Sequence, residues 1–515
     1  MARLATALAA VPLALTLVVS STVDAPAFAA PALGTSALGG SALDGSVLDG
    51  SVLDGSALGA PALGASTVDG SALGGSAAVA PGRVGGVVVT RSAGTGGSVV
   101  THYTGTLADG ATWIADVPGH WHGALILYSH GFGTLAPADA PSDAARQALL
   151  DRGYALTGSS YDPNGSLWAL ASATRDQFGA LAAVSALIGR PRIAIALGTS
   201  MGGLISTQEA ERAGGRLDAV VSTCGLLGGG IDLNNYQLDG EYALSRLLAP
   251  NQSIPLVGYS SPADGATAAG QLSALATAAQ STAAGRARVA LGTALLNMPT
   301  WSASQASPPA DATGIARAQY EWLVPTLPFI VPARYFIELS AGGNASWNAG
   351  VDYGALLARS PYRSTVVQLY RAAGLDLRAD LTDLTQHASV HADRPALVSL
   401  ARTSTLTGRL QVPTLTVHTL YDQLAPVEYE NRYAQQASGP LLRQAFVARR
   451  GHCAFTASEL VAAVQAAEHR AVTGHWDGTA TTRGLQSAAL RTGLGDAPAF
   501  VDFRPGPLVS HRSPW

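Results

Sequence analysis

Three side chains in this sequence have the types and surroundings that nucleophilic catalysis requires: Ser200, Asp422 and His452. Ser200 lies in a Gly-x-Ser-x-Gly pattern at 198–202, directly after an apolar run at 193–197. A serine at a sharp strand-to-helix turn projects its hydroxyl away from the backbone, and flanking glycines let strand and helix pass closely. In a chain with 58 glycines, the motif alone also fits an ordinary turn between strand and helix.

The other two side chains each follow a predicted strand. Asp422 ends the apolar run 412–421, and His452 comes shortly after the strand predicted at 444–448. The carboxyl ends of parallel strands meet at one edge of a sheet, so we expect Ser200, Asp422 and His452 to lie together there.

Other histidines and acids are weaker candidates for these roles. His130 is expected to fix a loop backbone, and His418 lies inside a strand pattern that favours a core position. His387 and His391 have the spacing of metal ligands, but no glutamate follows the first of them, so we expect no metal site. The remaining candidates are attributed to polar surface segments: His469, His475, Asp376, Asp380 and Asp383.

The pattern of strands and helices predicts an α/β fold with a mostly parallel, doubly wound sheet. Strands are expected at 84–90, 98–104, 112–117, 124–129, 154–159, 193–197, 217–222, 414–418 and 444–448, with helices at 142–152, 169–188 and 201–213. Residues 226–410 interrupt this alternation, and they are expected to form a mainly helical cap with helices at 241–248, 266–296, 312–323 and 363–373. The α/β core would then comprise 82–225 and 411–515. A second independent domain is the alternative to a cap.

The first 81 residues are expected to carry no chemistry. Residues 1–29 have a basic start, an apolar run and a small-residue cleavage site, which predicts a secretory signal peptide. Residues 30–81 contain pentad repeats rich in Ser, Leu and Gly, which we interpret as a flexible linker rather than a β-helix. We therefore expect a secreted, extracellular protein with no stable membrane insertion after cleavage.

Composition excludes several classes of function. The net charge of −4 gives no basic surface for nucleic acid. All 31 basic residues are arginine, so the chain has no Schiff-base lysine, P-loop lysine or Ser-Lys dyad. The proposed chemistry needs no cofactor. Cys224 and Cys453 lie after two of the strands, and in a secreted protein they are expected to form a disulfide, with two separate thiols as the alternative.

Taken together, residues 84–515 resemble the α/β-hydrolase superfamily, and within it secreted bacterial, actinobacterial-type serine esterases and depolymerases with a large cap. The resemblance rests on 121–123, 130–133, 198–203, 421–422 and 451–455. It implies that Ser200 is the nucleophile, that His452 is the general base and acid, and that Asp422 orients the histidine. It also implies that the Met201 N–H and an amide at Gly131 or Phe132 form the oxyanion hole. Trp168, on the loop after the strand at 154–159, is expected to contact the substrate.

The resemblance implies a serine hydrolase of small or polymeric carboxylic esters, including plant-derived ones. Aromatic residues of the cap are expected to line an acyl pocket or to form the cap's own core: Trp301, Tyr320, Trp322 and Trp347. The alternative is a serine peptidase, which needs carboxylates to seat an amine; Glu209, Glu211, Asp239 and Glu241 are candidates. A non-catalytic protein on the same scaffold is disfavoured by the complete set of catalytic residue types.

Overall fold

The computed structural model describes residues 82–84, 86–93, 99–133, 135–162, 166–437 and 439–513. The predicted signal peptide (1–29) and pentad-repeat linker (30–81) lie outside the described residues. Strands span Gly82–Val84 (β1), Val87–Ala93 (β2), Val99–Thr106 (β3), Thr112–Pro118 (β4), Ala124–Ser129 (β5), Ala155–Ser159 (β6), Ile193–Thr199 (β7), Ala219–Thr223 (β8), Thr414–Tyr421 (β9), Leu442–Arg450 (β10) and Phe500–Val501 (β11).

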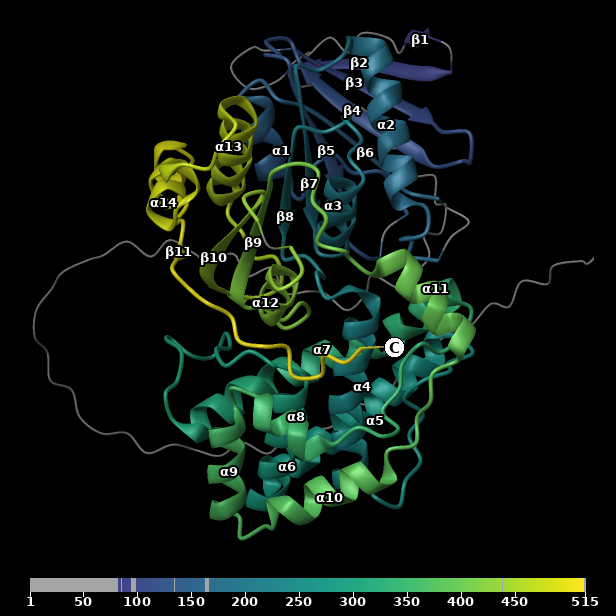
Figure 1. The fold of residues 1–515 in the computed structure, drawn as a ribbon, viewed down its shortest axis with the longest axis vertical. Coiled ribbons are helices and arrows are strands. Elements are labelled where there is room, and N and C mark those ends of the chain that lie inside the picture. Colours follow the sequence, from purple (N-terminus) through teal and green to yellow (C-terminus); the bar gives the residue numbers. More distant parts are fainter. Residues whose placement is uncertain are drawn as a thin grey trace, which may run out of the picture. The chain divides into compact units, whose positions relative to one another are not determined.

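Within the described part of the chain, these eleven strands form one sheet in the order β1-β2-β3-β4-β6-β5-β7-β8-β9-β10-β11 (Figure 1). The central strands from β6 to β10 run parallel. The strands β1 to β4 at one end and β11 at the other pair antiparallel to their neighbours. The predicted α/β sheet is confirmed, and the swap of β5 and β6 in the order shows that the chain winds in both directions.

Helices cover both faces of this sheet. They are α1 (Asp143–Leu150) and α13 (Ala457–Thr473) on one face, and α2 (Ala173–Ile188) and α3 (Met201–Glu211) on the other, with α14 (Thr482–Arg491) beside α13 (Figure 1). Side chains of β5 alternate between the two layers: Ile126 packs on the α13 side, and Leu125 and Leu127 pack on the α2 side. This alternation explains why the strand is apolar throughout, since both of its faces are buried.

The chain between β8 and β9 is mainly helical, as predicted, and lies beyond the carboxyl ends of the parallel strands (Figure 1). Its helices are α4 (Gly229–Leu248), α5 (Pro262–Ala278), α6 (Ala283–Leu295), α7 (Ala312–Ala341), α8 (Tyr353–Arg359), α9 (Arg363–Ala372), α10 (Leu377–His387) and α11 (Arg394–Ser404), with the short 3-10 turn η2 (Ala279–Ser281) between α5 and α6. Below, "the helical insertion" denotes residues 226–410.

Three helix predictions within the insertion were wrong. The helix expected at 241–248 begins earlier, at Gly229. The single helix expected at 266–296 is two helices, because Thr282 adopts an extended conformation and its side chain caps α6 by accepting from the Gly285 N–H. The helix expected to end at 323 continues to 341 through Pro325, Pro328 and Pro332. Each proline costs about 3 kcal/mol in a helix interior. The buried side chains of α7, including Leu327, Ile330 and Val331, offset that cost by packing in the core of the insertion.

The end of the chain ties the sheet to the helical insertion. After β11 the backbone leaves the sheet and runs to α4 (Figure 1). There Arg512 contacts Asp239 with its Nη1 at 2.5 Å from Oδ2, and His511 Nδ1 lies 2.9 Å from Asp232 Oδ1. The helix α12 (Glu428–Ala434) and the 3-10 turn η3 (Gly478–Ala480) complete the described elements.

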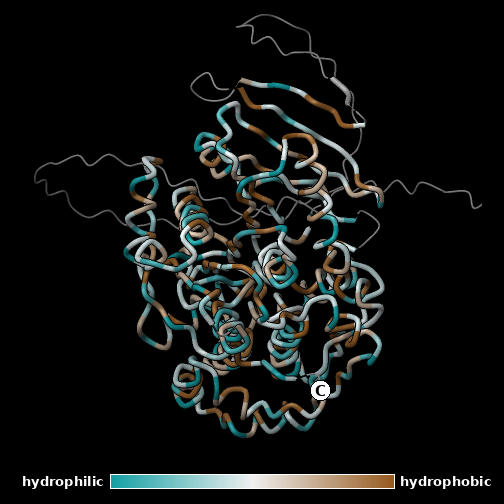
Figure 2. Tube along the Cα trace, turned by 45° about the horizontal axis from the view of Figure 1, so that its top comes forward, coloured by the Kyte–Doolittle hydropathy of each residue, from teal (hydrophilic) through white to brown (hydrophobic). Residues whose placement is uncertain are grey.

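None of the described helices is long and apolar enough to cross a membrane. Figure 2 shows why: hydrophilic and hydrophobic residues alternate along the helical segments, as expected for helices with one face in a core and one in water.

Candidate active site

Ser200 occupies a strained turn between β7 and α3. Its backbone has φ 61° and ψ −122°, a conformation that side-chain-bearing residues rarely adopt. The turn is held by the Ser200 N–H, which donates to Thr223 O at the end of β8 (3.0 Å). Positive φ at a residue with a side chain is a form of strain that concentrates at functional sites, and here it presents the hydroxyl above the sheet edge.

The glycines around Ser200 are required by backbone contacts. A Cβ on Gly198 would lie 1.9 Å from Gly202 O, and a Cβ on Gly202 would lie 1.8 Å from Ser129 O. Both distances are far inside van der Waals contact. The Gly-x-Ser-x-Gly pattern therefore exists because β5, β7 and α3 cross with no room for a methyl group.

The structure brings the three predicted side chains together. His452 Nε2 lies 2.8 Å from Ser200 Oγ, and His452 Nδ1 lies 2.9 and 2.8 Å from the two oxygens of Asp422. Asp422 follows β9 and His452 follows β10, so neighbouring parallel strands deliver both groups to one edge. The Asp422 side chain is fully buried, whereas that of His452 is 14% exposed. The chain of contacts thus runs from the interior toward solvent.

Asp422 is held as a carboxylate. Burial by itself would raise its pKa, but His452, His418 and the Ala425 N–H together lower the pKa below its ordinary value. The Leu424 and Ala425 N–H groups both donate to Asp422 Oδ1 at 2.9 Å. Hydrogen bonds to the charged form favour it. The acid is therefore ionised and oriented at neutral pH.

The predicted oxyanion residues border Ser200. A Cβ on Gly131 would lie 3.8 Å from Ser200 Oγ, so the backbone after β5 passes directly beside the hydroxyl. Met201 is the first residue of α3, where backbone N–H groups lack intrahelical partners. His130 fixes this loop: its ring stacks on Tyr161 at 4.1 Å, and its Nδ1 lies 2.8 Å from Gly131 O. Burial lowers the pKa of His130.

The turn at Ser200, the sheet order and the Ser…Asp…His order along the chain are those of one known fold. The chain is an α/β-hydrolase by fold.

Comparisons with known proteins add one relative. An o-phthalyl amidase from Xanthobacter agilis is 29% identical over 448 residues, which cover 80% of this chain and 96% of the amidase. No model of a protein family matches the chain.

Solved structures of esterases are also similar to this chain. An esterase from Aspergillus oryzae covers 72% of this chain and 81% of its own, with 12% identity and a TM-score of 0.39. The rice cell wall degrading esterase from Xanthomonas oryzae covers 75% and 90%, with 16% identity and a TM-score of 0.31.

A disulfide joins Cys224 to Cys453, as the sequence predicts. Cys224 follows β8, and Cys453 follows His452 directly. Among the described residues, these two cysteines with Asp422 and His452 form a group compact enough for a metal. Cysteines in a disulfide offer no thiolate, however, and the aspartate and histidine are bonded to each other.

Trp168 is more deeply buried than a substrate contact requires. Its side chain is 2% exposed, and it packs behind Phe132, with ring centroids 6.5 Å apart. Phe132 in turn contacts Phe329 and Phe336 of α7 at 5.9 and 6.0 Å. Because Phe329 is 45% exposed, the accessible aromatic surface beside the candidate oxyanion loop comes from α7. The sequence pattern did not indicate these two residues, because the helix expected at 312–323 ended before Pro325, the first proline of α7.

The four carboxylates considered for an amine seat all have structural partners. Glu209 accepts from Ser129 Oγ, Glu211 accepts from the Thr407 and Gly408 N–H groups, Asp239 pairs with Arg512, and Glu241 pairs with Arg334. His387, one of the two histidines with the spacing of metal ligands, also has a structural partner: its Nδ1 lies 3.1 Å from Asp383 Oδ1.

His418 is buried, as expected, but its position next to Asp422 was not predicted. It lies on β9, and its Nε2 is 3.9 Å from Asp422 Oδ2. The alternation of side chains places residues 418 and 420 on one face of β9, and extending the same period past the end of the strand reaches Asp422, so this period of two could have indicated the contact.

Proposed function

We propose that this chain is a serine hydrolase that cleaves carboxylic esters through an acyl-enzyme intermediate on Ser200. The observation that carries the proposal is the unbroken contact from Asp422 through His452 to Ser200 Oγ, with each heavy-atom distance below 3 Å. An accessible hydroxyl, a histidine within hydrogen-bond reach and a buried carboxylate that orients it are the parts that acyl transfer requires.

In the first half-reaction Ser200 Oγ attacks the substrate carbonyl carbon while its proton passes to His452 Nε2. The Asp422 carboxylate stabilises the imidazolium that results. The carbonyl oxygen becomes an oxyanion, and the N–H groups of Met201 and of Gly131 or Phe132 donate to it. When the intermediate collapses, the bond to the leaving group breaks, and His452 gives its proton to the departing alcohol.

In the second half-reaction water replaces the alcohol. His452 takes a proton from the water as the water oxygen attacks the acyl carbon. The bond to Ser200 Oγ breaks, the proton returns to Ser200, and a carboxylic acid is released. Each step uses the same base and the same oxyanion donors, and no metal or organic cofactor takes part.

The acyl group is proposed to lie against the aromatic surface of Phe132, Phe329 and Phe336. Phe132 follows Gly131, whose backbone borders Ser200. An acyl carbon bound to Ser200 Oγ therefore lies close to this surface. Edge-to-face contacts favour aromatic acyl groups over acetyl there. Trp168 would support Phe132 from behind rather than touch the substrate.

Amide hydrolysis is the second candidate, and the o-phthalyl amidase of Xanthobacter agilis favours it. The name of that enzyme specifies an o-phthalyl amide, and an aromatic acyl group of this kind suits the surface around Phe132. The peptidase alternative has less support, because the four carboxylates proposed to seat an amine bond to other groups.

Secretion remains part of the proposal. A disulfide persists in oxidising compartments, so Cys224–Cys453 supports an extracellular location.

Substrate profiling tests the proposal. Acetyl, octanoyl and benzoyl p-nitrophenyl esters should be compared with the phthalic acid monoamide of an aromatic amine and with aminoacyl nitroanilides. We expect turnover of the aryl esters, and of the monoamide if the amide candidate holds. Preference for aminoacyl nitroanilides would favour the peptidase alternative, and no turnover of any acyl substrate would overturn the proposal.

A further inference from the structure

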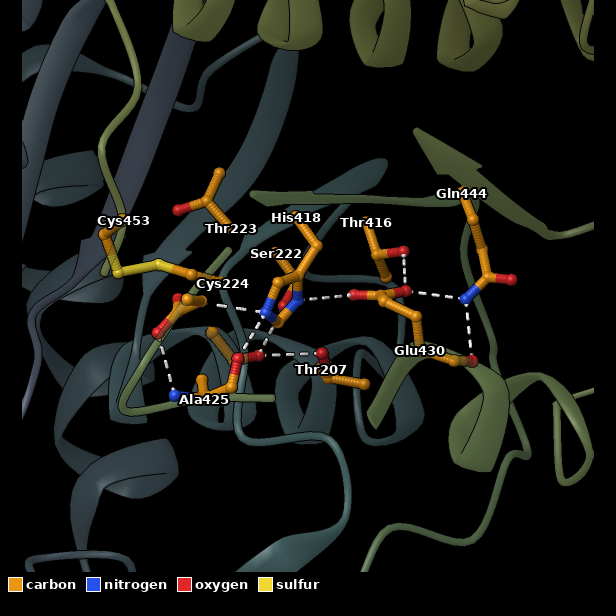
Figure 3. Close-up of polar contacts among 12 residues, drawn as sticks. Thr207, Ser222, Thr223, Cys224, Thr416, His418, Ala425, Glu430, Gln444 and Cys453 are labelled. Atoms are coloured by element: carbon orange, nitrogen blue, oxygen red, sulfur yellow. Dashed lines mark hydrogen bonds and ion pairs between the residues drawn. A yellow bond between two sulfur atoms is a disulfide. The ribbon is translucent and has the colours of Figure 1, made fainter. Parts of the chain in front are cut away.

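We propose that His418 is a permanently protonated positioning residue, whose imidazolium clamps the 422–425 turn and places a positive charge beside Asp422. The proposal deepens the function proposed above, because it concerns the same catalytic acid and base. It rests on a buried cluster of polar side chains behind Asp422, drawn in Figure 3.

Both ring nitrogens of His418 face hydrogen-bond acceptors. Nδ1 lies 3.2 Å from Glu430 Oε1, and Nε2 lies 2.8 Å from the carbonyl oxygen of Ala425 (Figure 3). A neutral imidazole has one N–H and one lone pair, so it would turn a lone pair toward one of these oxygens. The side chain is fully buried, where water cannot relieve that repulsion. When Glu430 is ionised, only the imidazolium satisfies both partners.

The counter-charge is equally well defined. Glu430, on α12, is fully buried, and its Oε2 accepts from Thr416 Oγ1 at 2.5 Å and from Gln444 Nε2 at 2.6 Å. Its Oε1 accepts from His418. In Figure 3, Thr416, His418 and Gln444 all point at this one carboxylate. Three donors to two oxygens favour the ionised acid. His418 and Glu430 therefore form a buried ion pair whose positive end faces Asp422.

The charges around His418 come from its own strand and from α12. Asp422 Oδ2 lies 3.9 Å from Nε2, and Glu428 of α12 is also in electrostatic contact. Burial would lower the pKa of His418, but Glu430 and then Asp422 hold it above its ordinary value. Burial raises the pKa of Glu428 to about 7, with His418 opposing the shift. Ser222 of β8 and Thr207 of α3, drawn in Figure 3, are uncharged.

This placement gives His418 two effects on the triad. Ala425 accepts from His418 through its carbonyl and donates to Asp422 Oδ1 through its N–H, so one hydrogen-bonded turn links the two side chains. The positive charge also helps to keep Asp422 ionised, because His418 Nε2 lies 3.9 Å from Asp422 Oδ2.

Two measurements test the proposal. The first is ¹⁵N NMR of the imidazole rings in the Ser200→Ala protein, which does not depend on activity. We expect one buried ring, assigned by its loss in His418→Gln, to carry protons on both nitrogens from pH 5.5 to pH 8.5. A neutral ring at pH 7 would overturn the proposal while leaving the serine mechanism untouched.

The second measurement is the pH profile of kcat/KM for His418→Gln. Because this variant removes a positive charge beside the Asp422–His452 pair, the acid limb of the profile should move to higher pH. We expect kcat to fall while KM is retained. Thr416→Val disturbs the same cluster without changing its charge, and His469→Gln removes a distant histidine that pairs with Asp477 at 2.6 Å.

Neither control variant should move the acid limb. A shift in Thr416→Val equal to that in His418→Gln would mean that packing, not charge, is responsible, and would contradict the proposal. If Ser200→Ala retained turnover, the function proposed above would fail, yet the NMR result would stand independently.

Discussion

Cys453, the residue directly after His452, is bonded to Cys224, which directly follows β8. Thr223, the last residue of β8, accepts the Ser200 N–H, so the disulfide links the surroundings of the proposed nucleophile to those of its base. Cys453 Sγ lies 3.3 Å from His452 Nε2. The disulfide thus restrains the loop that must hold the imidazole in place.

Removing this disulfide should lower stability and activity together. We expect the Cys224→Ser/Cys453→Ser double variant to lose roughly 2–5 kcal/mol of unfolding free energy. Because the histidine loop is released, kcat should fall at temperatures where the variant is still folded. Urea melts and kcat at 20 °C measure the two effects, with thiol-reduced native protein as the comparison. A loss of stability with unchanged kcat would show that the disulfide does not position His452.

Gly202 should not tolerate a methyl group. A Cβ there would lie 1.8 Å from Ser129 O, so Gly202→Ala must displace β5 or α3 and should cost about 3 kcal/mol along with most activity. The matched control is Gly270→Ala in α5, where no atom lies within 4 Å of the new Cβ. Thermal melts should show a gain of up to about 1 kcal/mol for the control, from helix propensity. Equal melting temperatures for the two variants would contradict this account of the motif.

The buried acid Asp139 should make stability depend on pH. Burial, and then the neighbouring Asp116, raise the pKa of Asp139 to about 8, although Arg146 opposes the shift. Above pH 3.8, the ordinary pKa of an aspartate, the unfolded chain releases the Asp139 proton, whereas the folded state retains it. This contribution to stability is complete below that value and is lost as pH rises toward 8.

The Asp139→Asn variant removes that loss, because asparagine stays neutral. Its unfolding free energy relative to the native protein should increase steadily between pH 5 and pH 8 in urea melts. Asp143→Asn, at an exposed position in the first turn of α1, is the control for the same substitution outside the buried cluster, and it should not reproduce this increase. A constant difference for Asp139→Asn would mean that Asp139 is already ionised at pH 5.

The aromatic side chains of α7 should set acyl preference. If Phe329 and Phe336 contact the acyl group, Phe329→Ala/Phe336→Ala should lower the benzoyl-to-acetyl ratio of kcat/KM by roughly three- to tenfold. Phe503→Ala is the control, because Phe503 is 42% exposed and packs on Phe446 of β10. An unchanged ratio in the double variant would place the acyl group elsewhere.

The sequence predicted the core of the molecule well and the helical insertion less well. Ser200, Asp422 and His452 each follow an apolar strand, and parallel strands leave few ways to arrange their ends, so their meeting could be foreseen. Inside the insertion, tertiary packing overrides local signals: α7 continues through three prolines, and Thr282 ends an apparently continuous helix. His418 could not be assigned a role because its ionisation depends on Glu430 and Ala425, whose proximity only the fold reveals.

The most direct test of the central claim is covalent trapping of the nucleophile. The protein should be treated with an alkyl fluorophosphonate, and the modified residue located by peptide mass spectrometry. Attack of Ser200 Oγ on phosphorus displaces fluoride, so we expect one adduct, on Ser200, with complete loss of ester turnover. The Ser200→Ala variant should acquire no adduct and should lose roughly 10⁴- to 10⁶-fold in kcat. Labelling at another residue, or turnover that survives in Ser200→Ala, would contradict the proposed mechanism.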